Sequence, residues 1–186
     1  MNGIECIEQH IEEKVLKSPY SEDPMHSKNT LKWVLLLCPD ADEALQIAAL
    51  GHDIERSLGE NRTQKTSFSD FNEYKNAHAK KSAQIMKGIL KTCGIAEAVI
   101  EDVMALICEH ETGGTERSNY LRDADSLSFF DHNLSYFFRR NNREEVLNRC
   151  RWGYNRLSPH LRHHLAGFQY ENKEIRELLE VVISGK

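Results

Sequence analysis

Hydrophobic residues recur at helical spacing along almost the whole chain, and this pattern predicts a protein built from helices. The first stripe consists of Ile4, Ile7, Ile11 and Val15. Further helices are expected over residues 26–38, 42–57, 71–94, 96–111 and 118–140, followed by two or three more that break around Ser158–Pro159 and near Gly167. No segment alternates between apolar and polar residues for long enough to predict a strand. The pattern therefore predicts an all-α fold of six or more helices.

Local signals mark where some of these helices begin and end. Pro39 ends the second helix, because proline cannot continue a helical hydrogen-bond ladder. Asp40 or Asp42 can cap the next helix by accepting a hydrogen bond from an exposed backbone N–H group. Residues 57–71 are polar and form the longest irregular stretch of the chain. We expect them to form a mobile loop beside an active site.

Length, composition and charge narrow the class of protein. The chain has 186 residues, 40% of them hydrophobic and 28% charged, which suits one soluble globular domain spanning 1–186. Its net charge of −5 disfavours a nucleic-acid-binding surface, which needs a basic excess. No apolar stretch approaches the roughly 20 residues that span a bilayer, and the first residues lack the pattern of a signal peptide. We therefore expect a cytoplasmic protein that binds neither nucleic acid nor membrane.

The cysteine pattern also favours a cytoplasmic protein. The five cysteines are Cys6, Cys38, Cys93, Cys108 and Cys150. They are odd in number and show no CxxC spacing, which is typical of reduced, mostly buried thiols in the cytosol. Neither a disulfide framework nor a zinc site is expected from them.

Histidines and aspartates near expected helix ends indicate a metal site. His26 stands at the start of one helix, the pair His52–Asp53 towards the end of the next, and Asp125 early in the helix over 118–140. Imidazole and carboxylate ligands together suit divalent metals such as Mn, Fe, Co, Ni or Zn, with Mg as an alternative. Adjacent side chains on a helix project about 100° apart. His52 and Asp53 can therefore share an ion only at the helix end or in the wedge between them, with other helices completing the site.

Two more histidines extend this arrangement. His78 lies inside the helix over 71–94, and His110 lies near the end of the helix over 96–111. They could bind a second ion that Asp53 bridges to the first, and a bridged pair of ions activates a water while holding a phosphate oxygen. With a single ion, the two histidines would instead donate hydrogen bonds to phosphate. The sequence leaves both arrangements open.

The order of these residues resembles the H…HD…D signature of the HD-domain metal-dependent phosphohydrolase superfamily. The segments GHDIER, HAKKSAQIM, ALICEHETGG and RDADSL are similar to motifs of that family. The resemblance covers a core from about residue 20 to 135 and leaves the C-terminal helices 136–186 unassigned. It implies an HD-domain helical bundle with the metal between the helices. It also implies hydrolysis of phosphate esters or anhydrides, usually of nucleotides.

The resemblance also implies roles for individual residues. The metal ligands would be His26, His52, Asp53 and Asp125, joined by His78 and His110 in two-metal members. Asp53, His78 and His110 would be catalytic. Asp125 is preferred over Asp123 because the family's ligand is the second acidic residue of the DAD-like triplet.

Three basic residues near these motifs are candidates for binding the substrate: Arg56, Lys80 and Arg122. Arg122 is the strongest of them, since it directly precedes Asp123. Arg56 follows Glu55 where many members of the family carry Gly–Lys. Arg56 could take over as the cation beside the metal, whereas Glu55 could equally be a solvated surface charge.

Three functions are compatible with this set of residues. The leading hypothesis is a metal-dependent phosphohydrolase acting on a small phosphorylated, nucleotide-like substrate. The second is an oxygenase that holds two irons on the same six ligands, and the metal would distinguish it from the first. The third is a metal-binding signalling module without turnover. A homodimer is compatible with the sequence, which determines neither the oligomeric state nor the identity of the substrate.

Overall fold

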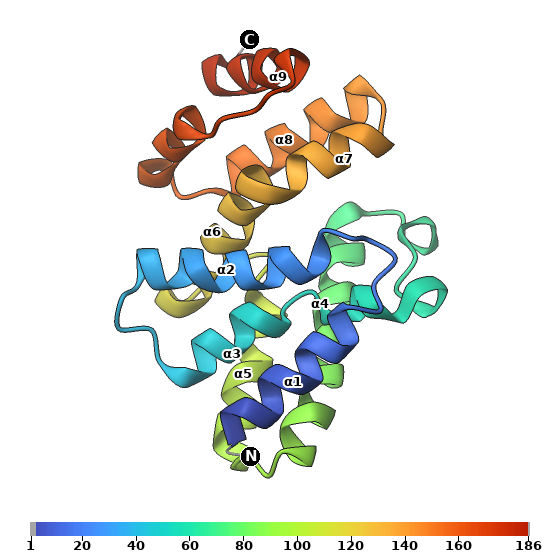
Figure 1. Cartoon of the computed structure of the whole chain (residues 1–186), viewed down its shortest axis with the longest axis vertical. Helices are drawn as coiled ribbons and strands as arrows, with labels where there is room; N and C mark the ends of the chain where they lie inside the picture. Colours follow the sequence, from blue (N-terminus) through green and yellow to red (C-terminus); the bar gives the residue numbers. More distant parts are fainter. Residues whose placement is uncertain (1–2, 186) are drawn as a thin grey trace.

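The computed structural model describes residues 3–185, and within them it contains nine α-helices and no strand (Figure 1). The helices are α1 (Gly3–Val15), α2 (Asp23–Leu37), α3 (Glu43–Gly51), α4 (Phe71–Thr92), α5 (Glu97–Glu109), α6 (Glu116–Ser128), α7 (Leu134–Arg140), α8 (Arg143–Arg156) and α9 (Lys173–Ser184). The other helical segments are the 3-10 segments η1 (Ile54–Asn61), η2 (Lys65–Ser67) and η4 (Pro159–Gly167) and the π segment η3 (Phe129–Asn133). The all-α prediction is confirmed.

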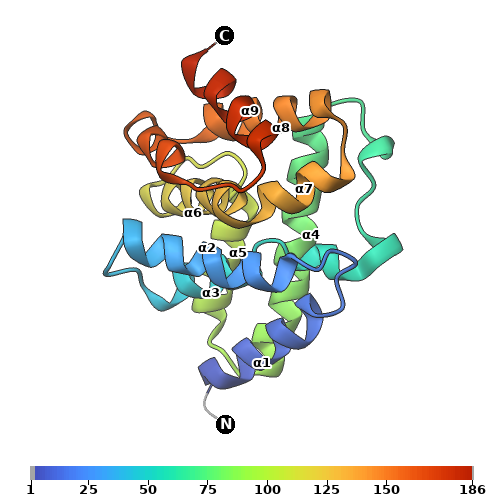
Figure 2. The ribbon, with the colours of Figure 1, turned by 45° about the horizontal axis from the view of Figure 1, so that its top comes forward.

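Helix α2 packs against α3 and α6, while α3 packs on α5, and α5 packs on α4. The C-terminal helices α7, α8 and α9 gather at the end of the molecule opposite α1 (Figures 1 and 2). None of the helices between residues 3 and 185 has the length and apolarity to span a bilayer.

The third helix is shorter than the pattern predicts. Asp42 caps its start, accepting a hydrogen bond from the backbone N–H of Leu45 at 2.9 Å. The helix ends at Gly51 rather than continuing to residue 57, and the chain passes through a turn at His52–Asp53 into η1. A Cβ atom on Gly51 would lie 2.4 Å from the sulfur of Met86, so glycine lets α4 approach closely. His52 and Asp53 therefore lie at the end of the helix rather than inside it.

The helix predicted over 118–140 is interrupted by the π segment Phe129–Asn133. A π turn frees a backbone carbonyl, and the hydroxyl of Tyr170 donates to the carbonyl of Phe130. Phe129 and Phe130 are buried in the core. The polar stretch over 57–71 contains no α-helix before α4 starts at Phe71, and it includes the end of η1 and the whole of η2.

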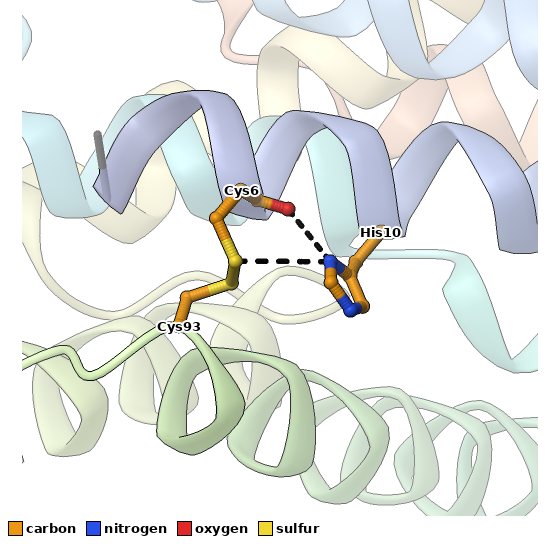
Figure 3. A group of neighbouring side chains, drawn as sticks. All are labelled: Cys6, His10 and Cys93. Atoms are coloured by element: carbon orange, nitrogen blue, oxygen red, sulfur yellow. Dashed lines mark hydrogen bonds between the residues drawn. A yellow bond between two sulfur atoms is a disulfide. The ribbon is translucent and has the colours of Figure 1, made fainter. Parts of the chain in front are cut away.

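The prediction that all five cysteines stay reduced is wrong for one pair. Cys6 of α1 and Cys93 at the end of α4 form a disulfide, with their Cα atoms 5.8 Å apart (Figure 3). The ring nitrogen Nδ1 of His10 lies beside the same pair, 2.8 Å from the carbonyl oxygen of Cys6. The two cysteines are 87 positions apart, so only the packing of α1 on α4 reveals the pairing. Cys38, Cys108 and Cys150 are free thiols.

Candidate metal centre

Four buried histidines from four different segments converge in the interior. His26 comes from the first turn of α2, and His52 directly follows α3. His78 lies inside α4, and His110 directly follows α5. Each has a relative exposure of 3% or less. Residues far apart in the sequence therefore meet at one place, as the predicted site requires.

Each imidazole uses its Nδ1 atom to contact a supporting group. Nδ1 lies 2.9 Å from Ser128 Oγ in His26, 2.9 Å from the Ala49 carbonyl in His52, 2.8 Å from Glu55 Oε2 in His78 and 2.6 Å from the Ile107 carbonyl in His110. A carbonyl oxygen only accepts, so Nδ1 carries the proton in His52 and His110. This arrangement fixes the ring orientation and turns all four Nε2 atoms towards the acidic residues, as second partners do for metal-bound histidines.

The ligand atoms form two neighbouring groups. In the first, Asp125 Oδ1 lies 3.2 Å from His26 Nε2 and 3.5 Å from His52 Nε2. The second contains Asp53, His78, His110 and Glu111, and in each group the ligand atoms lie within 4.8 Å of one another.

Asp53 faces both groups. Its Oδ1 lies 2.7 Å from His78 Nε2 and 3.8 Å from His110 Nε2. It is also 3.9 Å from His52 Nε2, while Oδ2 is 3.9 Å from His26 Nε2. Asp53 is thus placed between the two groups, where a bridging carboxylate is predicted.

The residues present fit a divalent metal. The Nε2 atoms of His52 and His110 are buried and have no hydrogen-bond partner among residues 3–185. Because Nδ1 carries the proton, a neutral ring presents its Nε2 lone pair to carboxylate oxygens, an unfavourable contact that a cation removes. Imidazole and carboxylate donors in this mixture are those that divalent transition metals prefer.

The pKa shifts of the cluster also favour a bound cation. Burial opposes a charge on His78, but the nearby Asp53 and Glu55 carboxylates outweigh it and raise the pKa of His78 to about 9. Burial also opposes a charge on His52, and the carboxylates of Asp53 and Asp125 nevertheless raise its pKa. Burial would raise the pKa of Asp53, yet the charges of His52 and His78 hold it well below its usual range. The cluster therefore attracts positive charge strongly.

Sequence reasoning missed two members of the surroundings and left the place of a third open. Glu111, beside His110 in the sequence, is buried and lies 3.0 Å from His110 Nε2. Arg156 of α8 contacts Asp125 Oδ2 at 2.5 Å and Glu111 Oε2 at 3.2 Å, so the unassigned C-terminal part reaches the centre. Glu55 is buried, with 1% exposure, and is not the solvated charge that the sequence allowed. Only the adjacency of Glu111 to His110 was visible in the sequence.

The three predicted substrate-binding residues lie in different surroundings. Arg56 pairs with Asp23 at 2.8 Å and approaches Asp53 at 3.4 Å, so it flanks the centre. Lys80 is exposed, with its charge near the Cys108 thiol of α5. Within residues 3–185, Lys80 forms no hydrogen bond or ion pair with the four histidines.

Arg122 belongs to a separate polar group. Its guanidinium lies 3.1 Å from Asp123 and 2.9 Å from the hydroxyl of Ser158. The backbone N–H of Ser158 also donates to Asp123, at 2.9 Å. Asp123 thus anchors the start of η4, while Asp125 faces the histidines.

The comparisons with known proteins give a family but no activity. Residues 8–179 match a family described as "Domain of unknown function (DUF4202)". No curated protein matches the chain. No solved structure matches it either. Because the match covers most of the chain, this protein belongs to the DUF4202 family.

Proposed function

We propose that this protein is a metal-dependent phosphohydrolase of the HD-domain type that acts on a phosphate ester or anhydride of a nucleotide-like substrate. The observation that carries the proposal is the convergence of four Nε2 atoms on Asp53 and Asp125, with every Nδ1 atom engaged elsewhere. Supported histidines mixed with carboxylates characterise catalytic metal sites. The order of these residues along the chain resembles the HD signature, and this resemblance is the reason for proposing phosphate hydrolysis as the reaction.

In this proposal, the two groups of side chains divide the ligands between two ions. His26, His52 and Asp125, with Asp53, would hold one ion, and Asp53, His78, His110 and Glu111 would hold a second. A divalent metal bound there supplies a water of lowered pKa and an electrophilic contact for a phosphoryl oxygen.

The chain's own residues would bind and orient the substrate. Asp53 is the most open of the acids in the centre, with a side chain 17% exposed, so phosphate would arrive beside it. Arg56 contacts Asp53, and Lys75 contacts Glu111, so each places a cation beside the centre. These two cations would attract an anionic substrate and help to orient it. If only the first group holds metal, protonated His78 donates a hydrogen bond from Nε2 to a phosphoryl oxygen.

A pair of histidine variants tests the proposal. His52→Ala removes a ligand, whereas His163→Ala removes an exposed histidine of η4 and serves as the control. We expect the wild type and the control to bind Mn, Co or Ni and to hydrolyse at least one compound in a screen of nucleotides and simple phosphate esters. His52→Ala should remain helical by circular dichroism and lose both properties. Hydrolysis at the wild-type rate in His52→Ala would contradict the proposal.

Glu111 favours a second candidate, the di-iron oxygenase. Its carboxylate gives the second group two acids beside two histidines, a ligand set that also suits a pair of iron ions. Iron content together with oxygen consumption on addition of substrate would distinguish this candidate. A redox-silent metal in the active protein would exclude it.

A further inference from the structure

Three guanidinium groups gather around the ring of Tyr20, in the connection between α1 and α2. The guanidinium carbons of Arg56, Arg62 and Arg140 lie 4.7, 5.3 and 4.9 Å from the ring centroid. Arg56 and Arg62 both belong to the segment that starts with η1, and Arg140 ends α7. Like charges repel, so gathering three cations costs free energy unless anions compensate them.

Two of the three cations are compensated within the protein. Arg56 pairs with Asp23 at 2.8 Å and with Asp53 at 3.4 Å. Arg140 binds the carboxylate of Glu22 through both terminal nitrogens, one of them at 2.9 Å. These two arginines have their carboxylate partners in place.

Arg62 differs because its partners are neutral. It donates to the carbonyl of Gly59 at 3.0 Å and to the hydroxyl of Tyr20 at 3.0 Å, and no carboxylate in residues 3–185 forms an ion pair with it. A guanidinium has five N–H donors, so three remain for a ligand. Its side chain is only partly buried, which leaves it accessible.

Gly59 explains how Arg62 is held. With φ 58° and ψ −120°, Gly59 kinks the segment in a conformation that side chains with a Cβ avoid. The kink places the Gly59 carbonyl within reach of Arg62, while the Tyr20 ring supports the guanidinium. Arg62 is therefore oriented before any ligand arrives, which lowers the entropy cost of binding.

We propose that Arg62 and Tyr20 form an anion subsite that binds a second phosphate, or a comparable oxyanion group, of the substrate. Arg56 connects this subsite to the metal centre, because its guanidinium contacts both the Tyr20 ring and the Asp53 carboxylate. One ligand can thus place one anionic group beside Asp53 and another on Arg62. The inference rests on the proposed function and specifies the substrate class: a phosphate compound with a second anionic group, such as a bisphosphate.

Calorimetric titration of the Mn-loaded protein tests this subsite. The probes are butyl phosphate, with one phosphate, and the bisphosphates of propanediol, butanediol and hexanediol, whose flexible chains cover a range of spans. The variants are Arg62→Gln and, as a matched control, Arg139→Gln, which removes an exposed guanidinium 5.6 Å from the ring centroid of Tyr136. Each substitution removes one positively charged guanidinium that lies near a tyrosine ring.

We expect at least one bisphosphate to bind the wild type and the control about tenfold or more tightly than butyl phosphate, since a charge-assisted bidentate contact is worth at least that. Arg62→Gln should abolish this preference. An equal preference in Arg62→Gln and the wild type would overturn the subsite, as would the absence of any preference in the wild type while butyl phosphate still binds. If Arg62-dependent binding is found without hydrolysis of any phosphate, the subsite holds and the proposed function fails.

Discussion

The raised pKa of His78 predicts that the metal-free protein loses stability as the pH rises. Asp53 and Glu55 raise the pKa of this buried histidine from 6.5 to about 9. The protonated ring therefore stabilises the folded state fully below pH 6.5, and this contribution is lost as the pH rises through about 9. A difference of this size corresponds to roughly 3 kcal/mol of unfolding free energy. Metal bound at Nε2 would replace the proton and remove the dependence.

Urea unfolding measures this effect directly. The unfolding free energies of the metal-free wild type and of His78→Gln would be measured at a pH near 6 and at a pH near 9.5. The comparison is between the changes in unfolding free energy from one pH to the other, because a constant stability difference between the two proteins then cancels. We expect the unfolding free energy of the wild type to fall by roughly 3 kcal/mol more than that of the variant. Parallel pH dependences in the two proteins would refute the assignment of a buried, proton-binding Nε2 to His78.

Three further substitutions test the support of the centre and the fold. Glu55→Gln weakens the orientation of His78 and should lower metal affinity about 10- to 100-fold, measured by Mn titration; unchanged affinity would show that Glu55 is dispensable. Gly51→Ala places a methyl group against Met86 and should lower the unfolding free energy by about 1–3 kcal/mol in urea, whereas an unaffected protein would contradict the close packing of α4 on this turn. Cys6→Ser opens the loop that Cys93 closes and should cost roughly 4–5 kcal/mol under non-reducing conditions; equal stability of the two proteins would show that the disulfide does not form.

Much of the candidate centre is readable from the sequence because its proposed ligands stand at helix ends or on helices of clear periodicity. His52 and Asp53 follow the apolar run of α3, and their neighbours in space come from α2, α4, α5 and α6. The order of these residues along the chain is enough to propose a set. It is not enough to place the turn after Gly51, which depends on the contact with Met86 of α4.

The remaining members depend on tertiary packing. Arg156 lies 31 positions beyond Asp125, in a helix without any recognisable motif, and only the packing of α8 on α6 brings them together. The pairing of Cys6 with Cys93 likewise follows from α1 lying against α4. The carboxylate of Glu55 turns inward because His78 donates to it, a contact that spans 23 positions. Sequence periodicity predicts which face of a helix is buried, but not which polar groups meet there.

Anomalous diffraction from crystals of the Mn-loaded protein would show whether the four histidines surround a metal ion. We expect a peak about 2.0–2.3 Å from Nε2 of His52 and within bonding distance of Asp125, with any second peak beside His78 and Asp53. If the protein binds no metal at this place, or only at another site such as the cluster of Cys6 and His10, the histidine cluster is not a metal centre.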